Sequence, residues 1–148
     1  MAKRERIYRG FVPDDDGDRT IRIDGEQIRG RWVYGGPPKP GESEPDREGL
    51  PVIPETVGEW TGLTDRAGNK IYEDDIIEAC FKPGQYGVIR FGVYKNPFND
   101  DKFAGHAGFY VEWIIGDEKD ITRKDLGYWC LLKSGTGNIW ENPDLLDD

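Results

Sequence analysis

The stretch TVGEWTGLTDRAGNKIYEDDIIEACF, residues 56–81, decides the fold that we predict. A strand opens it, and Asp65, Gly68 and Asn69 then form a turn. Gly and Asn tolerate positive φ, so the chain can reverse direction here before an apolar pattern resumes at Ile71. The stretch therefore predicts neighbouring strands rather than a helix.

The same alternation of polar and apolar residues occurs along most of the chain. We predict strands near residues 6–11, 19–23, 30–35, 56–61, 75–81, 85–94, 107–115 and 136–141. One short helix is predicted around residues 123–132, because Leu126, Trp129 and Cys130 fall at i, i+3 and i+4. The predicted class is mainly β, with α+β as the alternative, and has a small SH3-like or meander β-barrel core and an N-terminal β segment.

Composition supports one β-rich domain over residues 1–148. The chain has 20 Gly and 10 Pro but one Met, which favours turns and short strands over long helices. Five Trp, seven Tyr and six Phe supply large surfaces to bury. Residues 36–49 are rich in Pro, Gly and acids, and we interpret them as a flexible loop within the domain.

Charge and hydropathy limit the partners of this chain. Its formal net charge is −9, and no apolar run approaches the ~18 residues that would span a bilayer. We therefore expect a cytoplasmic protein that does not bind membranes, with the bulk of the domain repelling nucleic acid. Residues 1–35 are the local exception, with eight Lys or Arg against seven acids.

The arginines and aromatic residues of this N-terminal segment form the candidate binding surface. Core packing is the default for aromatic strands, but an exposed aromatic face could bind a peptide, or single-stranded nucleic acid if arginines lined it. Besides Arg4, the residues that could contact a partner are Arg6, Arg9, Arg22, Arg29, Arg31, Trp32 and Tyr34.

Five segments together resemble the YopX family of bacteriophage and prophage proteins. They are RG at 9–10 with WVYG at 32–35, PETVGEWTGLTD at 54–65, GNKIYEDDII at 68–77, YGVIRF at 86–91 and GNIWENPDLL at 137–146. They follow the family's order and span nearly the whole chain. The chain departs from the family pattern at Asp74, where the family usually has Gly, and at the proline-rich loop, which resembles an insertion.

The resemblance implies a phage or prophage accessory protein, made in a bacterial cytoplasm, with a mainly β fold and possible self-association. It implies no catalytic residues and no cofactor, because no biochemical activity is established for the family.

The residues themselves offer little enzymatic chemistry. Consecutive carboxylates at Glu73, Asp74 and Asp75 point apart on a strand or turn, so we interpret them as a solvated turn. Cys80, His106 and Cys130 could form a Cys2His zinc site, but their spacing does not preorganise two ligands, and we expect the cysteines to be buried thiols. We predict no catalytic, cofactor or metal site.

Three function classes follow from these observations. We expect a non-enzymatic binding module that acts on a host or phage protein. One alternative is a nucleic-acid-associated module that uses the basic N-terminal strands, and the other is an enzyme built on the zinc site.

We predict that the chain forms a homo-oligomer through its aromatic strands. A small sheet of short strands must close, cover its edges or pair with another copy. Sedimentation equilibrium at micromolar concentration tests this prediction. A monomer mass at physiological salt would contradict it.

Overall fold

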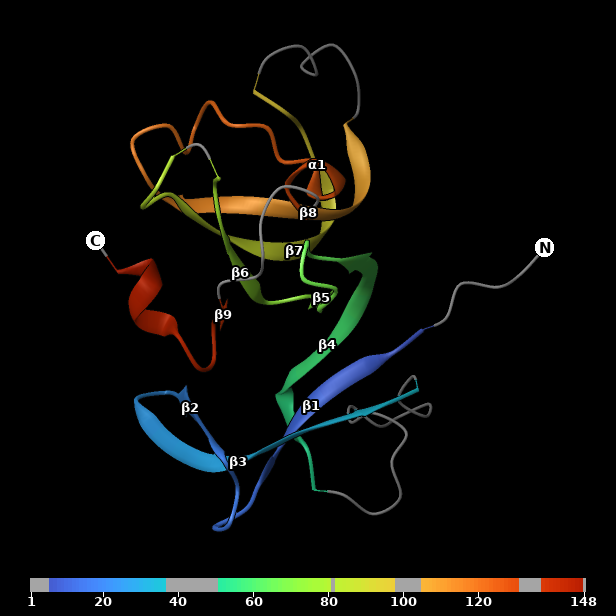
Figure 1. The fold of residues 1–148 in the computed structure, drawn as a ribbon, viewed down its shortest axis with the longest axis vertical. Coiled ribbons are helices and arrows are strands. Elements are labelled where there is room, and N and C mark those ends of the chain that lie inside the picture. Colours follow the sequence, from blue (N-terminus) through green and yellow to red (C-terminus); the bar gives the residue numbers. More distant parts are fainter. Residues whose placement is uncertain (1–5, 37–50, 81, 98–104, 131–136, 148) are drawn as a thin grey trace, which may run out of the picture.

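The computed structural model describes residues 6–36, 51–80, 82–97, 105–130 and 137–147, which form two antiparallel sheets (Figure 1). The predicted mainly β class is confirmed, and one of the sheets is a curled half-barrel. Within the described ranges the elements are β1 (Tyr8–Pro13), β2 (Arg19–Ile23), β3 (Glu26–Gly35), β4 (Ile53–Thr64), β5 (Lys70–Tyr72), β6 (Asp75–Glu78), β7 (Tyr86–Tyr94), β8 (His106–Ile115), the α-helix α1 (Leu126–Cys130), β9 (Gly137–Asn138) and the 3-10 helix η2 (Pro143–Leu146).

The N-terminal sheet has the strand order β2-β3-β1-β4-β5. Asp24 and Gly25 have φ angles of 51° and 82° and connect β2 to β3 in a two-residue hairpin turn. β3 therefore begins at residue 26, whereas the sequence analysis predicted a start at residue 30. The difference arises because an Asp-Gly pair forms a two-residue hairpin turn, so the hydrogen bonds between β2 and β3 begin directly after it.

The turn after β4 forms as predicted. One carboxylate oxygen of Asp65 accepts the backbone N–H groups of Ala67 and Asn69, each at 2.9 Å. Gly68 has a φ of +88°, which glycine adopts without a steric penalty. The three-residue strand β5 follows this turn, and it was not among the predicted strands.

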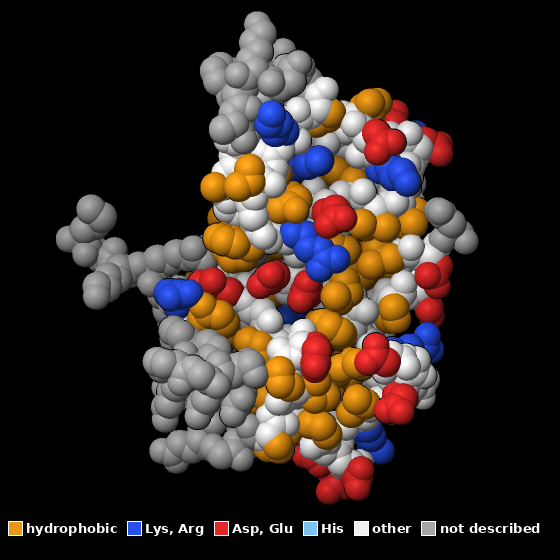
Figure 2. Space-filling view, turned by 180° about the vertical axis from the view of Figure 1, so that it is seen from behind, with side chains coloured by type: hydrophobic (Ala, Val, Ile, Leu, Met, Phe, Trp, Pro, Cys, Tyr) orange, Lys and Arg blue, Asp and Glu red, His pale blue; other side chains and the backbone are white. Residues whose placement is uncertain are grey.

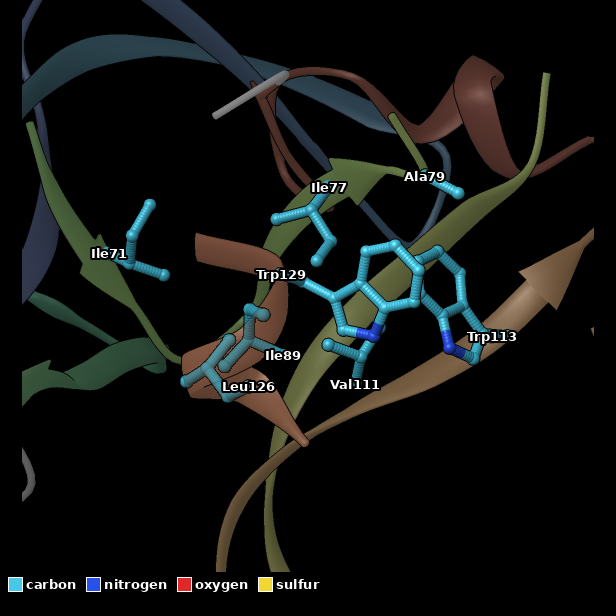
Figure 3. Packing of buried hydrophobic residues seen from close by; sticks show 8 residues of the cluster. All are labelled: Ile71, Ile77, Ala79, Ile89, Val111, Trp113, Leu126 and Trp129. Atoms are coloured by element: carbon cyan, nitrogen blue, oxygen red, sulfur yellow. The ribbon is translucent and has the colours of Figure 1, made fainter. Parts of the chain in front are cut away.

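The second sheet has the order β8-β7-β6-β9 and carries the larger hydrophobic core. Figure 3 shows Trp113 of β8 and Trp129 of α1 side by side in this cluster, with ring centroids 5.1 Å apart. Leu126 and Trp129 are each 3% exposed, so the predicted spacing does bury one face of the helix. The side chain of Cys130 and residues 131–136 lie outside the described residues.

Both core indoles donate a hydrogen bond to the same backbone oxygen. The Nε1–H groups of Trp113 and Trp129 reach the carbonyl oxygen of Arg123 at 2.9 and 2.8 Å. A carbonyl oxygen has two lone pairs, so one oxygen satisfies both buried donors. This arrangement fixes α1 against β8.

The two faces of the N-terminal sheet differ in composition. Phe11 and Trp32 lie opposite each other on β1 and β3 and make an edge-to-face contact at 5.1 Å. Val12 and Val33 belong to a separate cluster of buried valines. Because alternate residues of a strand point to opposite faces, the aromatic face is also the face of Arg9, whose cross-strand neighbour is Tyr34.

Strand positions are otherwise as predicted to within a few residues, except that β9 covers only the first part of 136–141. Most of the predicted loop at 36–49 lies outside the described residues. Among the described residues, no helix is long and apolar enough to span a membrane.

Candidate functional site

A buried arginine lies between two aromatic rings where the two sheets meet. Arg9 of β1 is 7% exposed, and its guanidinium carbon lies 4.8 Å from the ring centroids of both Trp32 and Tyr72. The two rings come from β3 and β5. A cation is attracted to the face of an aromatic ring, and the attraction grows when water is excluded.

Asp75, the first residue of β6, supplies the compensating charge. Its Oδ1 lies 2.8 Å from Nη2 of Arg9, and its Oδ2 accepts the backbone N–H of Tyr72 at 2.8 Å. Arg9 Nη2 also donates to the carbonyl oxygen of Glu73 at 3.3 Å. A buried charge pair needs such additional hydrogen bonds to offset desolvation. The contact joins β1 of the N-terminal sheet to β6 of the second sheet.

The prediction of a solvated turn at residues 73–75 is therefore only half right. Glu73 and Asp74 do form the turn between β5 and β6, but Asp75 begins β6 and is 8% exposed. Asp74 has a φ of +72°, and its Oδ1 accepts Arg90 Nη1 at 3.0 Å. Its backbone N–H donates to Ile89 and its carbonyl oxygen accepts from Ile139, so the turn is held by both neighbouring segments.

Burial has the largest effect on the pKa values of the ionisable side chains around this turn. Burial raises the pKa of Asp75, against the opposing effects of the Arg9 guanidinium and the Tyr72 N–H. Burial likewise raises the pKa of Asp74 despite Arg90. In Glu73, burial and the charge of Asp74 raise the pKa. Burial, together with the nearby Tyr34, raises the pKa of Tyr72 to about 12.

A pocket of about 300 Å³ opens beside the buried pair, and we call it the junction pocket. Residues from six strands, β1, β2, β3, β5, β6 and β9, and from the turn before β5 line it. Trp32 and Tyr34 form its aromatic part, and Arg9, Arg19 and Lys70 are its cationic residues. The site thus brings together residues from both sheets.

The C-terminal segment forms one wall of the junction pocket. Glu141 accepts the Trp32 indole N–H at 2.9 Å and the Asn138 amide at 3.3 Å. Asn138 Oδ1 in turn accepts the backbone N–H groups of Trp140 and Glu141 at 3.0 and 2.8 Å. The Trp32 bond fixes the wall against the N-terminal sheet, and the other three bonds shape the C-terminal segment itself.

The structure brings together three of the seven predicted partner-binding residues. Arg9, Trp32 and Tyr34 line the junction pocket, although Arg9 is buried and not on an open surface. Tyr34 is 47% exposed. The aromatic residues are therefore divided between core and surface.

The other four predicted arginines do not form a shared surface. Arg29 and Arg31 alternate with the aromatic residues along β3. Arg22 lies on β2 and Arg6 precedes β1, and each of the four has a partner within the chain. Arg4 lies outside the described residues. The contacts are Arg6 with Glu59 at 3.2 Å, Arg22 with Asp144 at 3.2 Å, Arg31 with Asp14 at 3.4 Å, and Arg29 with the carbonyl oxygen of Gly17 at 2.6 Å.

The prediction that the cysteines are buried is wrong for Cys80. Cys80 is exposed, and not a buried thiol, because it follows β6 in the connection to β7. His106 is exposed on β8, with its ring 5.3 Å from that of Tyr94. In the described part of the chain, no group of three or more His, Cys, Asp or Glu could hold a metal ion.

The sequence did not point to the other nine lining residues of the junction pocket, among which Arg19, Lys70, Asp75 and Glu141 carry charges that matter for the site. Arg19 begins a correctly predicted strand, but its place beside Glu141 depends on the fold of the C-terminal segment. The one local signal for a charge partner was that Asp75 directly precedes the apolar pair Ile76 and Ile77 at the start of β6. The other three had no signal in the sequence.

A second pocket of about 330 Å³ lies between Lys82–Gln85 and Ile115–Lys119. Its walls are two connecting segments of the second sheet, without aromatic side chains. The junction pocket is the stronger candidate because it combines aromatic residues with charges from both sheets.

A family model described as YopX protein matches residues 34–147 of the chain. No curated protein matches the sequence of the chain.

We predict that Arg9 and Asp75 stabilise the fold only as a pair. Arg9→Met leaves the Asp75 carboxylate buried without its partner, so the free energy of unfolding should fall by about 3–5 kcal/mol. Asp75→Asn in the Arg9→Met background should recover part of this loss. Urea unfolding of the wild type, both single variants and the double variant measures the coupling, and additive effects would contradict it.

We predict that Asp74→Asn makes stability less dependent on pH. A raised pKa means that the folded chain binds the Asp74 proton more tightly, so ionisation lowers stability as the pH rises through the folded pKa. Asn removes this cost and tolerates positive φ. Relative to the wild type, the variant should gain stability between about pH 4 and pH 7.

Urea midpoints across this pH range provide the measurement, with Asp15→Asn in an exposed turn as the control. A pH profile of the Asp74 variant parallel to that of the wild type would contradict the prediction.

Proposed function

Because the chain belongs to the YopX protein family, we propose that it is a non-enzymatic binding module of a bacteriophage or prophage, which docks a host or phage protein at the junction pocket. The proposal assigns the protein to the bacterial cytoplasm and gives it no catalytic role. Its support comes from the family resemblance and from the geometry of the pocket.

The observation that carries the proposal is the half-exposed aromatic residue at the pocket. Tyr34 is 47% exposed, although its ring lies 5.9 Å from that of the buried Tyr72. The Tyr34 side chain therefore has a firm inner contact and an open outer surface. Aromatic residues beside a preformed pocket are typical anchors of protein interfaces, since they bury much area at little entropic cost.

The arrangement of charged side chains favours a protein partner over a nucleic acid. The four N-terminal arginines outside the pocket, Arg6, Arg22, Arg29 and Arg31, contact acids or a backbone oxygen of the same chain, so neutralising phosphates would break contacts that already exist. On the face in Figure 2, Lys and Arg side chains alternate with Asp, Glu and hydrophobic residues and form no continuous basic surface. The net charge of −9 opposes a polyanion as well.

Self-association remains a separate proposal with a different surface. Phe91 and Val93 of β7 are 64% and 70% exposed. They lie opposite Phe109 and Ala107 of β8. This apolar pair offers a second copy a contact that leaves the junction pocket open.

We predict that Tyr34→Ala abolishes partner capture without unfolding the protein. Tagged wild type, recovered from infected or prophage-induced cells, should bring down a stoichiometric partner. Loss of a central aromatic anchor should reduce the recovered partner at least about tenfold.

The matched control is Tyr128→Ala, because Tyr128 of α1 is 43% exposed and lies outside the pocket. Circular dichroism of both variants verifies the fold. Equal recovery by both variants, or no partner with the wild type, would contradict the proposed function.

A further inference from the structure

The acidic residues of the junction pocket are already occupied as hydrogen-bond acceptors. Asp65 accepts two backbone N–H groups and the Asn69 amide. Asp75 contacts Arg9 and the Tyr72 N–H. Glu141 accepts from an indole and an amide, as described above. These carboxylates therefore have little capacity left for a ligand.

The cationic residues of the pocket, by contrast, have N–H groups that can still donate a hydrogen bond. The Lys70 ammonium lies 5.2 Å from the centroid of the Trp60 ring, and no described carboxylate lies within ion-pair distance of it. Arg19 is 3.6 Å from Glu141, beyond hydrogen-bond distance, and its side chain is 58% exposed. The Nε–H of Arg9 is buried and has no acceptor among the described residues.

We propose that the junction pocket binds a carboxylate, carried by an Asp or Glu side chain of the docking partner. This inference rests on the proposed function and specifies its ligand. Arg19 and Lys70 donate to the carboxylate, and charge-assisted bonds of this kind are about twice as strong as neutral ones. Trp32 and Tyr34 contact the apolar part of the same segment.

Arg9 sets the electrostatics of the pocket without contacting the ligand. Its Nε atom is shielded from solvent between the two rings, so a carboxylate reaches the more exposed cations first. The unsatisfied donor nevertheless adds positive potential to the pocket wall, and in a low-dielectric setting such potential favours an anion.

A single carboxylate fits the surroundings better than a phosphate chain. Nucleic acid would bring further negative charges against a protein of net charge −9. A carboxylate brings one charge, which the two exposed cations can match at short range. The volume of about 300 Å³ is also the size of one small ligand group with its neighbours.

The test uses the isotopically labelled full chain and defined small probes. N-acetyl-glutamate amide, its glutamine isostere and inorganic phosphate are titrated at constant ionic strength, and the Trp32 indole N–H and Arg9 Nε–H signals are followed by NMR. The glutamate probe should shift both signals saturably. Arg19→Ala and Lys70→Ala should each weaken its binding about tenfold.

Arg31→Ala is the control, since Arg31 pairs with Asp14 and lies outside the pocket. Unchanged affinity in this variant supports the assignment. Equal binding of the glutamine isostere, tighter binding of phosphate, or no saturable shift would overturn it. If Tyr34→Ala loses the captured partner while the glutamate probe does not bind, the carboxylate inference fails and the proposed function stands.

Discussion

The structure depends on one buried cation. Arg9 can lie inside the domain only if its charge meets a carboxylate and its flat faces meet apolar surface, and Asp75, Trp32 and Tyr72 supply these contacts. Each of the four residues belongs to a different strand. Because a carboxylate oxygen lies 2.8 Å from the guanidinium, the two sheets cannot slide against each other without exposing an unpaired charge. The interaction thus fixes the relative position of the sheets and shapes the pocket beside them.

Most of the fold follows from local patterns in the sequence. The alternation of residues places β2, β7 and β8 almost to the residue, and the spacing of Leu126 and Trp129 predicts the helix. The patterns fail where a turn is shorter than expected. β3 starts early because Asp24 and Gly25 suffice to reverse the chain. β5 has only three residues, too few for alternation to be recognised, and its place depends on pairing with β4.

The candidate site could be predicted only in part, for a physical reason. The aromatic residues Trp32 and Tyr34 mark a candidate binding surface by residue type alone. Asp75, the counter-charge of Arg9, is the last of three consecutive acids. Such a run predicts a solvated turn, because acidic side chains normally face water. The burial of Asp75 is a property of the assembled sheets: β9 pairs with Asp75, and Ile89 of β7 and Ile139 bond to the neighbouring Asp74. Likewise, the acids that pair with the arginines come from other segments of the chain, and no local pattern encodes these pairings.

The wall formed by Asn138 and Glu141 has a consequence for how the protein is made. Glu141 bonds to Trp32 across 109 residues, and Arg22 reaches Asp144 across 122 residues. A ribosome releases the N-terminal hairpins first, and contacts of such long separation form late, because closing the loop between them has an entropic cost. During synthesis, the aromatic side of the pocket is therefore present without its opposite wall. A translation product that stops before residue 137 contains the residues of β1 to β8 but lacks this wall, so its junction pocket is incomplete.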